Sequence, residues 1–76
     1  MKDIPLLAIA GTRREYIDVA YTASSVRAFR YIDGADRLRG IRGGVLLLVG
    51  SWRKRDDIGE ILQTADANGI VLVEML

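Results

Sequence analysis

Hydrophobic residues gather in three short runs along the chain, and each run predicts a β-strand. The least ambiguous run is Val45–Val49, which contains no polar residue and lies between glycines. Such a run is typical of a central strand in a parallel sheet, where both faces are covered. Ile4–Ala10 is also apolar on both faces and ends at Gly11, and Ile70–Val73 forms the third run. We therefore expect strands at all three places.

Apolar residues at helical spacing predict three helices between the strands. Thr12 is placed to cap a helix over Arg13–Ala23, and Asp33 to cap a shorter one over Ala35–Ile41. A third helix is expected over Arg55–Asn68, because acidic residues fill its first turns and Asn-Gly follows as a left-handed stop. The supporting stripes are Ile17, Ala20 and Tyr21, then Ala35, Leu38 and Ile41, then Ile58, Ile61, Leu62 and Ala65.

The segment Val26–Ile32 alternates in a way that predicts a strand at the edge of the sheet. Arg27 falls on one face of this strand and Arg30 on the other, so neither face is expected to be dry. Charged residues on an edge strand also prevent unwanted pairing with other sheets. The second strand therefore belongs at an edge, whereas Val45–Val49 belongs inside.

The elements alternate as β-α-β-α-β-α-β, which predicts an α/β fold with right-handed crossovers. The strand order 2-1-3-4 keeps the third strand inside and the second at an edge. The order 3-2-1-4 would bury the arginines of the second strand, so we reject it. We predict one small α/β domain over residues 1–76, with a four-stranded parallel sheet in the Rossmann-like arrangement.

The composition excludes several classes of function but does not identify one. The 76 residues carry a net charge of +1, so a strong general attraction to nucleic acid or to an anionic membrane is not expected. The sequence has no cysteine and no histidine, which removes thiolate catalysis, histidine bases and the usual zinc ligands. We therefore expect a protein that is not an enzyme and needs no cofactor or metal. A cytoplasmic location is expected because no apolar stretch approaches the length of a membrane helix.

Two loops are expected at the carboxyl ends of the first and third strands, where ligands of such sheets usually bind. Both loops open a helix and offer free backbone N–H groups, which favours an anion such as a phosphate. The candidate anion-binding residues are Gly11, Thr12, Arg13, Gly50 and Ser51. The alternative is structural, because strand-to-helix turns use glycine and caps use Thr or Ser. The glycine signatures of nucleotide-binding loops do not occur in the sequence.

A second candidate surface combines one tryptophan with arginines. Trp52 lies in a loop with Arg53 and Arg55, and Arg27 and Arg30 lie on the predicted edge strand. Tryptophan and arginine are enriched where proteins bind one another, so these five residues form the candidate partner-binding surface. The alternative is local ion pairing, because Asp56 and Asp57 follow directly.

Two stretches of the chain resemble a group of small proteins from actinobacterial phages. In that group a Tyr-x-x-x-x-x-x-Leu-Arg-Gly stretch precedes an apolar strand, after which Gly-Ser/Thr-Trp and Arg-x-Asp open a helix. Arg30–Gly40 and Val49–Asp57 follow this pattern, and the resemblance covers roughly residues 28 to 65. It implies a Rossmann-like phage accessory protein without an assigned activity, acting in the cytoplasm of the host on a bacterial host protein.

Together these observations favour a non-enzymatic interaction module that self-associates, binds a bacterial host protein and disturbs host growth. Self-association is expected because no helix follows the last strand, Ile70–Val73, to cover it. The alternative function is the binding and sequestration of a nucleotide or a phosphorylated metabolite at the anion-binding residues. Neither a membrane nor a nucleic acid is expected as a partner.

Overall fold

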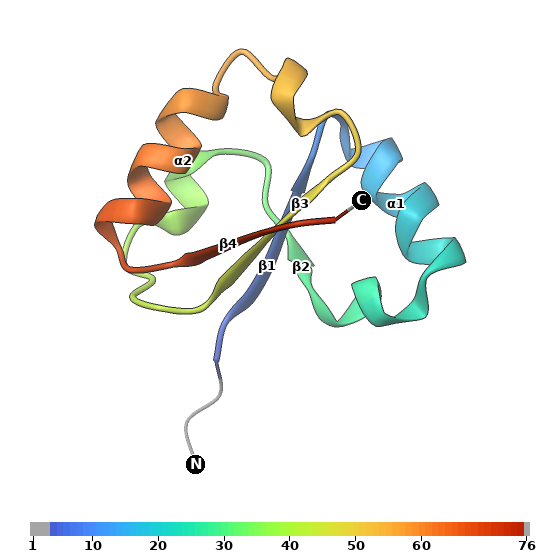
Figure 1. Cartoon of the computed structure of the whole chain (residues 1–76), viewed down its shortest axis with the longest axis horizontal. Coiled ribbons are helices and arrows are strands. Elements are labelled where there is room, and N and C mark those ends of the chain that lie inside the picture. The colour runs from blue at the N-terminus through green and yellow to red at the C-terminus, as the bar shows by residue number, and fades with distance from the viewer. Residues whose placement is uncertain (1–3, 76) are drawn as a thin grey trace.

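The computed structural model describes residues 4–75, which form one parallel sheet with helices on both faces (Figure 1). The strands are β1 (Leu6–Ala10), β2 (Arg30–Tyr31), β3 (Val45–Val49) and β4 (Val71–Glu74). The α-helices are α1 (Arg13–Thr22) and α2 (Ile58–Ala67). Short 3-10 helices fill three connections, as η1 (Ser24–Ala28), η2 (Ala35–Leu38) and η3 (Trp52–Lys54).

The strand order is β2-β1-β3-β4 and every pair is parallel, which confirms the predicted order 2-1-3-4. β3 pairs along its whole length with β1, from Val45 opposite Leu6 to Val49 opposite Ala10, and its other edge pairs with β4. The prediction that Val45–Val49 is a central strand is therefore confirmed. Within the described residues no helix is long and apolar enough to cross a membrane.

The two faces of the sheet carry separate hydrophobic cores. α2 and η2 cover one face, and α1 with η1 covers the other (Figure 1). Neighbouring residues of β3 alternate between the two cores, as the strand periodicity requires. The α2 core contains Leu7, Ile9, Ile32, Leu38, Leu46, Leu48, Trp52, Ile61, Ala65 and Ile70. The α1 core contains Ala8, Ala10, Ala20, Val26, Leu47 and Val49.

The predicted strand over Val26–Ile32 is wrong in its first half. Residues 24–28 instead form η1, and only Arg30–Tyr31 pairs with β1. Val26 is buried beneath α1, and the Arg27 Nε atom donates a hydrogen bond to the carbonyl oxygen of Ala20. These tertiary contacts with α1 outweigh the period-two pattern that predicted a longer strand.

Two of the three predicted helices are shorter than the pattern indicated. The helix expected over Ala35–Ile41 is only the 3-10 turn η2, in which Asp33 provides no cap, and Gly40 adopts a left-handed φ of +81°. The helix expected from Arg55 begins at Ile58 and is preceded by the separate turn η3. Consequently the structure has two α-helices among the described residues, not three.

Although η2 is short, its Leu38 side chain anchors it to the α2 core. Leu38 is fully buried, so Leu38→Ala should lower the free energy of unfolding by about 2–5 kcal/mol. The neighbouring exposed substitution Arg39→Ala should change it by about 0.5 kcal/mol or less. Urea denaturation followed by circular dichroism measures both values, and equal effects of the two substitutions would contradict this anchoring role.

Candidate functional site

The loops after β1 and β3 do meet at one rim of the sheet, as predicted, but a side chain of the protein fills the space between them. Glu15, in the first turn of α1, directs its carboxylate at both loops. Its Oε1 atom accepts hydrogen bonds from the backbone N–H groups of Gly11 at 2.9 Å and Ser51 at 3.0 Å. The Ser51 hydroxyl donates to the same carboxylate, at 2.8 Å to Oε2.

This arrangement uses the donors that were predicted to bind an external anion. The backbone N–H groups of Gly11 and Ser51 and the Ser51 hydroxyl all serve Glu15. A Cβ atom at Gly11 would lie 2.7 Å from the Ser51 Oγ atom and 2.9 Å from the Glu15 Oε1 atom, and one at Gly50 would overlap the Glu15 carboxyl group. The glycines are thus explained by the close approach of Ser51 and Glu15 to Gly11 and of Glu15 to Gly50. In this conformation the predicted anion site holds an anion of the protein itself.

The sequence itself carries a signal for this contact. Thr12 and Glu15 have the Thr-x-x-Glu spacing of a capping box. The Thr12 hydroxyl accepts a hydrogen bond from the Glu15 backbone N–H at 3.1 Å, as predicted for a cap. In the usual capping box the glutamate reaches back to the capping residue, whereas here it extends to Gly11 and across to Ser51.

The hydrogen bonds at the rim also change the acidity of Glu15. The Ser51 hydroxyl is the main cause, and together with the backbone N–H groups of Ser51 and Gly11 it lowers the Glu15 pKa below the ordinary value of 4.5. Burial acts in the opposite direction but is outweighed. The carboxylate is therefore ionised, and bound in place, throughout the neutral range.

Arg55 closes the neighbouring part of the rim. Its guanidinium donates to the carbonyl oxygens of Ala10 at 3.1 Å and Asp33 at 2.9 Å, and to the Tyr31 hydroxyl at 3.3 Å. It also binds the Asp57 carboxylate through Nε at 2.8 Å, which raises the Arg55 pKa and lowers the Asp57 pKa. Only 13% of the side chain is exposed. Arg55 thus connects the ends of β1 and β2 instead of presenting a charge to a partner.

Trp52 does not form the expected contact surface. Its ring belongs to the α2 core and only 8% of the residue is exposed, so little of Trp52 is available to a partner. Arg53 covers the ring, with its guanidinium carbon 4.7 Å from the ring centroid, and pairs with Glu74 at 2.9 Å. The loop residue that a sequence reading assigns to binding is here the residue that fixes η3 to the core.

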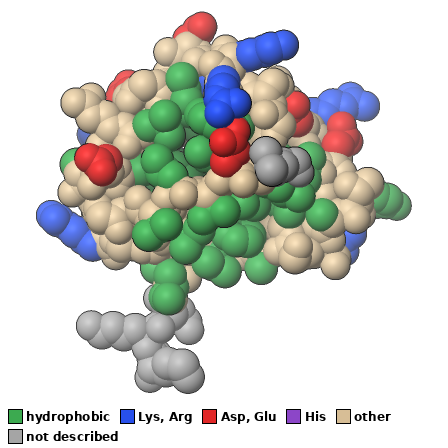
Figure 2. Space-filling view, viewed as in Figure 1, with side chains coloured by type: hydrophobic (Ala, Val, Ile, Leu, Met, Phe, Trp, Pro, Cys, Tyr) green, Lys and Arg blue, Asp and Glu red, His purple; other side chains and the backbone are tan. Residues whose placement is uncertain are grey.

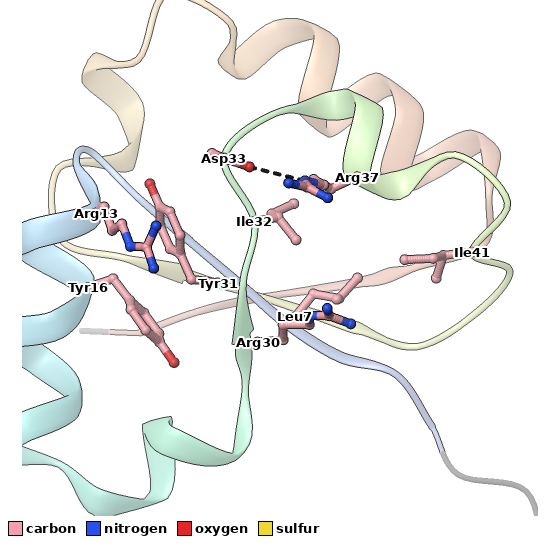
Figure 3. Close-up of a pocket in the computed structure, with 9 residues that line it drawn as sticks. All are labelled: Leu7, Arg13, Tyr16, Arg30, Tyr31, Ile32, Asp33, Arg37 and Ile41. Atoms are coloured by element: carbon pink, nitrogen blue, oxygen red, sulfur yellow. Dashed lines mark hydrogen bonds and ion pairs between the residues drawn. The ribbon is translucent and has the colours of Figure 1, made fainter.

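The remaining predicted arginines lie elsewhere in the fold. Arg27 is bonded to α1 through Ala20, whereas Arg30 and Arg13 line a cavity of about 520 Å³ beside β2 (Figure 3). The five predicted partner residues thus differ in environment, since Trp52 and Arg55 make internal contacts whereas Arg27, Arg30 and Arg53 are exposed. The cavity is completed by residues that sequence reasoning did not select as a site, among them Tyr16, Tyr31, Asp33 and Arg37. No group of three potential metal ligands occurs in residues 4–75.

Replacing the rim carboxylate should destabilise the fold. Glu15→Gln retains one acceptor oxygen but turns an amide N–H₂ toward hydrogen-bond donors, so the free energy of unfolding should fall by about 1–3 kcal/mol. The matched control is Glu60→Gln on the exposed side of α2, which should change it by about 0.5 kcal/mol or less. Denaturant titration at neutral pH gives both values, and a neutral result for Glu15→Gln would refute the role assigned to its carboxylate.

The same contact predicts how stability depends on pH. Glu15 and Asp57 have lowered pKa values in the folded state, so their stabilisation is present above their ordinary values of 4.5 and 3.8. It is lost as the pH falls through the lower folded-state values. Thermal melts should therefore show a falling Tm below about pH 4.5, and Glu15→Gln should flatten that dependence. An unchanged pH profile in the variant would count against the contact.

Comparisons with known proteins found no matching family model, no matching curated protein and no matching solved structure. The resemblance to phage proteins and the Rossmann-like relationship accordingly stay predictions from the sequence. Function has to be inferred from the contacts and exposed surfaces of residues 4–75 themselves.

Proposed function

We propose that the protein is a non-enzymatic interaction module that self-associates by pairing the free edge of β4 with the same edge of a second copy. The observation that carries the proposal is the exposure of an apolar strand. Val71, Leu72 and Val73 are apolar, yet they are 60%, 40% and 42% exposed on the edge strand β4. Figure 2 looks onto this edge and shows hydrophobic side chains gathered around β4.

The backbone of β4 supports the same conclusion. The N–H groups of Val71 and Met75 donate to the carbonyl oxygens of Gly44 and Leu48, so these residues face inward. Because backbone groups alternate sides along a strand, Leu72 and Glu74 turn their N–H and C=O groups away from β3. An edge of this kind is a ready template for a further strand.

One face of β4 also lacks a covering helix. Val71 and Val73 pair with Val45 and Leu47, and Leu47 belongs to the α1 core. The helix on this face, α1, packs with residues of β1 and β3, and no residue of β4 belongs to its core. The chain thus leaves an apolar stripe, formed by Val71 and Val73, beside which the same residues of a second copy would pack.

A two-fold arrangement pairs the free backbone groups and places the apolar side chains of the two copies beside each other. Two copies of β4 running antiparallel about Val73 place Leu72 of each copy opposite Glu74 of the other, so that the outward-facing backbone groups pair. Val73 then meets its own counterpart, with Val71 and Met75 beside it on the same face. Glu74 is already paired with Arg53, which reduces repulsion between the acidic residues. A second copy is therefore the occupant that suits this edge best.

The absence of enzymatic activity in the proposal rests on the chemistry available. The whole sequence lacks histidine and cysteine, and the rim donors already hold Glu15. No observation favours the alternative of nucleotide or phosphorylated-metabolite binding at Gly11, Thr12, Arg13, Gly50 and Ser51. The bacterial host protein, the effect on host growth and the cytoplasmic location stay predictions from the sequence.

The proposal predicts that charge in the middle of β4 prevents association. The wild-type protein should elute as a dimer at micromolar concentration, and Val73→Lys should shift it to a monomer, because the two lysines would face one another across the two-fold axis. Size-exclusion chromatography with light scattering measures the masses, and circular dichroism verifies that the variant is folded.

Tyr21→Lys is the control for this experiment, since Tyr21 is an exposed hydrophobic residue on α1 and away from β4. It should leave the dimer intact. A wild-type protein that remains monomeric, or a dimer that Val73→Lys leaves unchanged, would overturn the proposed mode of association.

A further inference from the structure

The cavity beside β2 extends around the free edge of that strand to both faces of the sheet. Tyr16 and Tyr31 pack on the α1 core, and their rings lie 5.1 Å apart. Leu7 and Ile32 belong to the α2 core on the opposite face, yet they line the same cavity. Figure 3 shows β2 running between these two groups of side chains. A ligand that fills this cavity must therefore lie along the strand edge.

The charge of the cavity is predominantly positive. Three guanidinium groups, those of Arg13, Arg30 and Arg37, line it together with one carboxylate, that of Asp33. Arg37 is paired with Asp33 at 3.4 Å. Arg13 and Arg30 form no ion pair or side-chain hydrogen bond with any residue from 4 to 75, and both are exposed. Within the described part of the chain, these two positive charges are thus unpaired, one on each face of the sheet at β2.

The backbone of β2 provides one outward-facing residue between these charges. The Ile32 N–H donates to the Ala8 carbonyl oxygen, so Ile32 faces β1. By alternation, the N–H and C=O groups of Tyr31 point away from β1 toward the open edge. The carbonyl oxygen of Phe29, which would be the next outward acceptor, already accepts a hydrogen bond from the Tyr16 hydroxyl.

We propose that the β2 edge binds an extended acidic segment of a partner protein, which adds to the sheet as a further strand beside Tyr31. An added strand turns consecutive side chains to opposite faces of the sheet. Two adjacent acidic residues in the partner would therefore meet Arg13 on one face and Arg30 on the other. The inference names the partner chemistry of the proposed interaction module, but it uses the edge opposite to the one that self-associates.

The arginines also explain why this edge does not accept an arbitrary strand. An apolar segment would remove water from the two guanidinium groups without pairing their charges, and a basic segment would be repelled by them. A compact anion on one face would satisfy only one of the two free charges. An extended acidic segment satisfies both charges and the Tyr31 backbone groups together, which is why the structure favours this occupant.

The probe for this proposal is a short fluorescein-labelled peptide with two adjacent glutamates at its centre, compared with the same peptide carrying glutamines. Fluorescence polarisation should show saturable binding of the glutamate peptide that weakens as salt is added. The glutamine peptide should bind at least about tenfold more weakly, since charge-assisted hydrogen bonds are lost. In amide NMR spectra, the Tyr31 N–H signal should shift when the glutamate peptide binds.

Variants separate the two free arginines from the general charge of the protein. Arg13→Gln and Arg30→Gln should each weaken binding of the glutamate peptide by about tenfold. Arg14→Gln removes the same charge from the neighbouring position of α1, outside the cavity lining, and should change binding by less than about twofold. All three positions are exposed, so the variants should fold as the wild type does.

Several results would overturn the proposal. These are equal binding of the two peptides, equal effects of Arg13→Gln and Arg14→Gln, or binding of inorganic tripolyphosphate or a single-stranded oligonucleotide in preference to the peptide. Val73→Lys keeps the outcome distinct from the test of self-association, because it should leave peptide binding unchanged. Loss of peptide binding in that variant would place the peptide at β4 and also reject the β2 assignment.

Discussion

The hydrogen bonds of one carboxylate, that of Glu15, occupy the part of the sheet where a ligand would otherwise bind, and so determine which surfaces remain open to a partner. Glu15 joins the start of α1 to the loops after β1 and β3, and so ties three segments of the chain at the point where the sheet reverses its winding. In larger sheets of this order that point is the usual ligand site. Here an internal anion satisfies the loop donors, and Arg55 satisfies the neighbouring carbonyl oxygens.

Because the donors and acceptors at the rim are satisfied internally, the groups that remain available to a partner lie at the two edges of the sheet. β4 presents apolar side chains and outward backbone groups, whereas β2 presents arginines around a single outward residue, Tyr31. The two edges thus differ in chemistry as well as in length. The proposed self-association at β4 and the proposed acidic partner at β2 both rest on this difference.

The features that could be predicted from the sequence are those fixed by strong, local patterns. The unbroken apolar run Val45–Val49 identified the central strand. The arginines of the predicted second strand placed it at an edge, although only Arg30 lies in β2. Weaker patterns failed where tertiary contacts were stronger. The alternating pattern around Val26 predicted a strand, but Val26 is buried beneath α1 in the turn η1. The sequence analysis assigned Trp52 to a partner surface and did not select Glu15. Residue type alone does not show whether a side chain near a loop points to solvent or packs against the protein.

The position of β2 and β4 at opposite ends of the sheet has a consequence for any assembly built through β4. Joining two copies there makes one continuous sheet that ends in a β2 strand on either side. The assembly would be bivalent, with identical terminal strands facing away from each other. A partner that carries two suitable segments, or that is itself oligomeric, would then be held by avidity, since occupation of one end raises the effective concentration at the other.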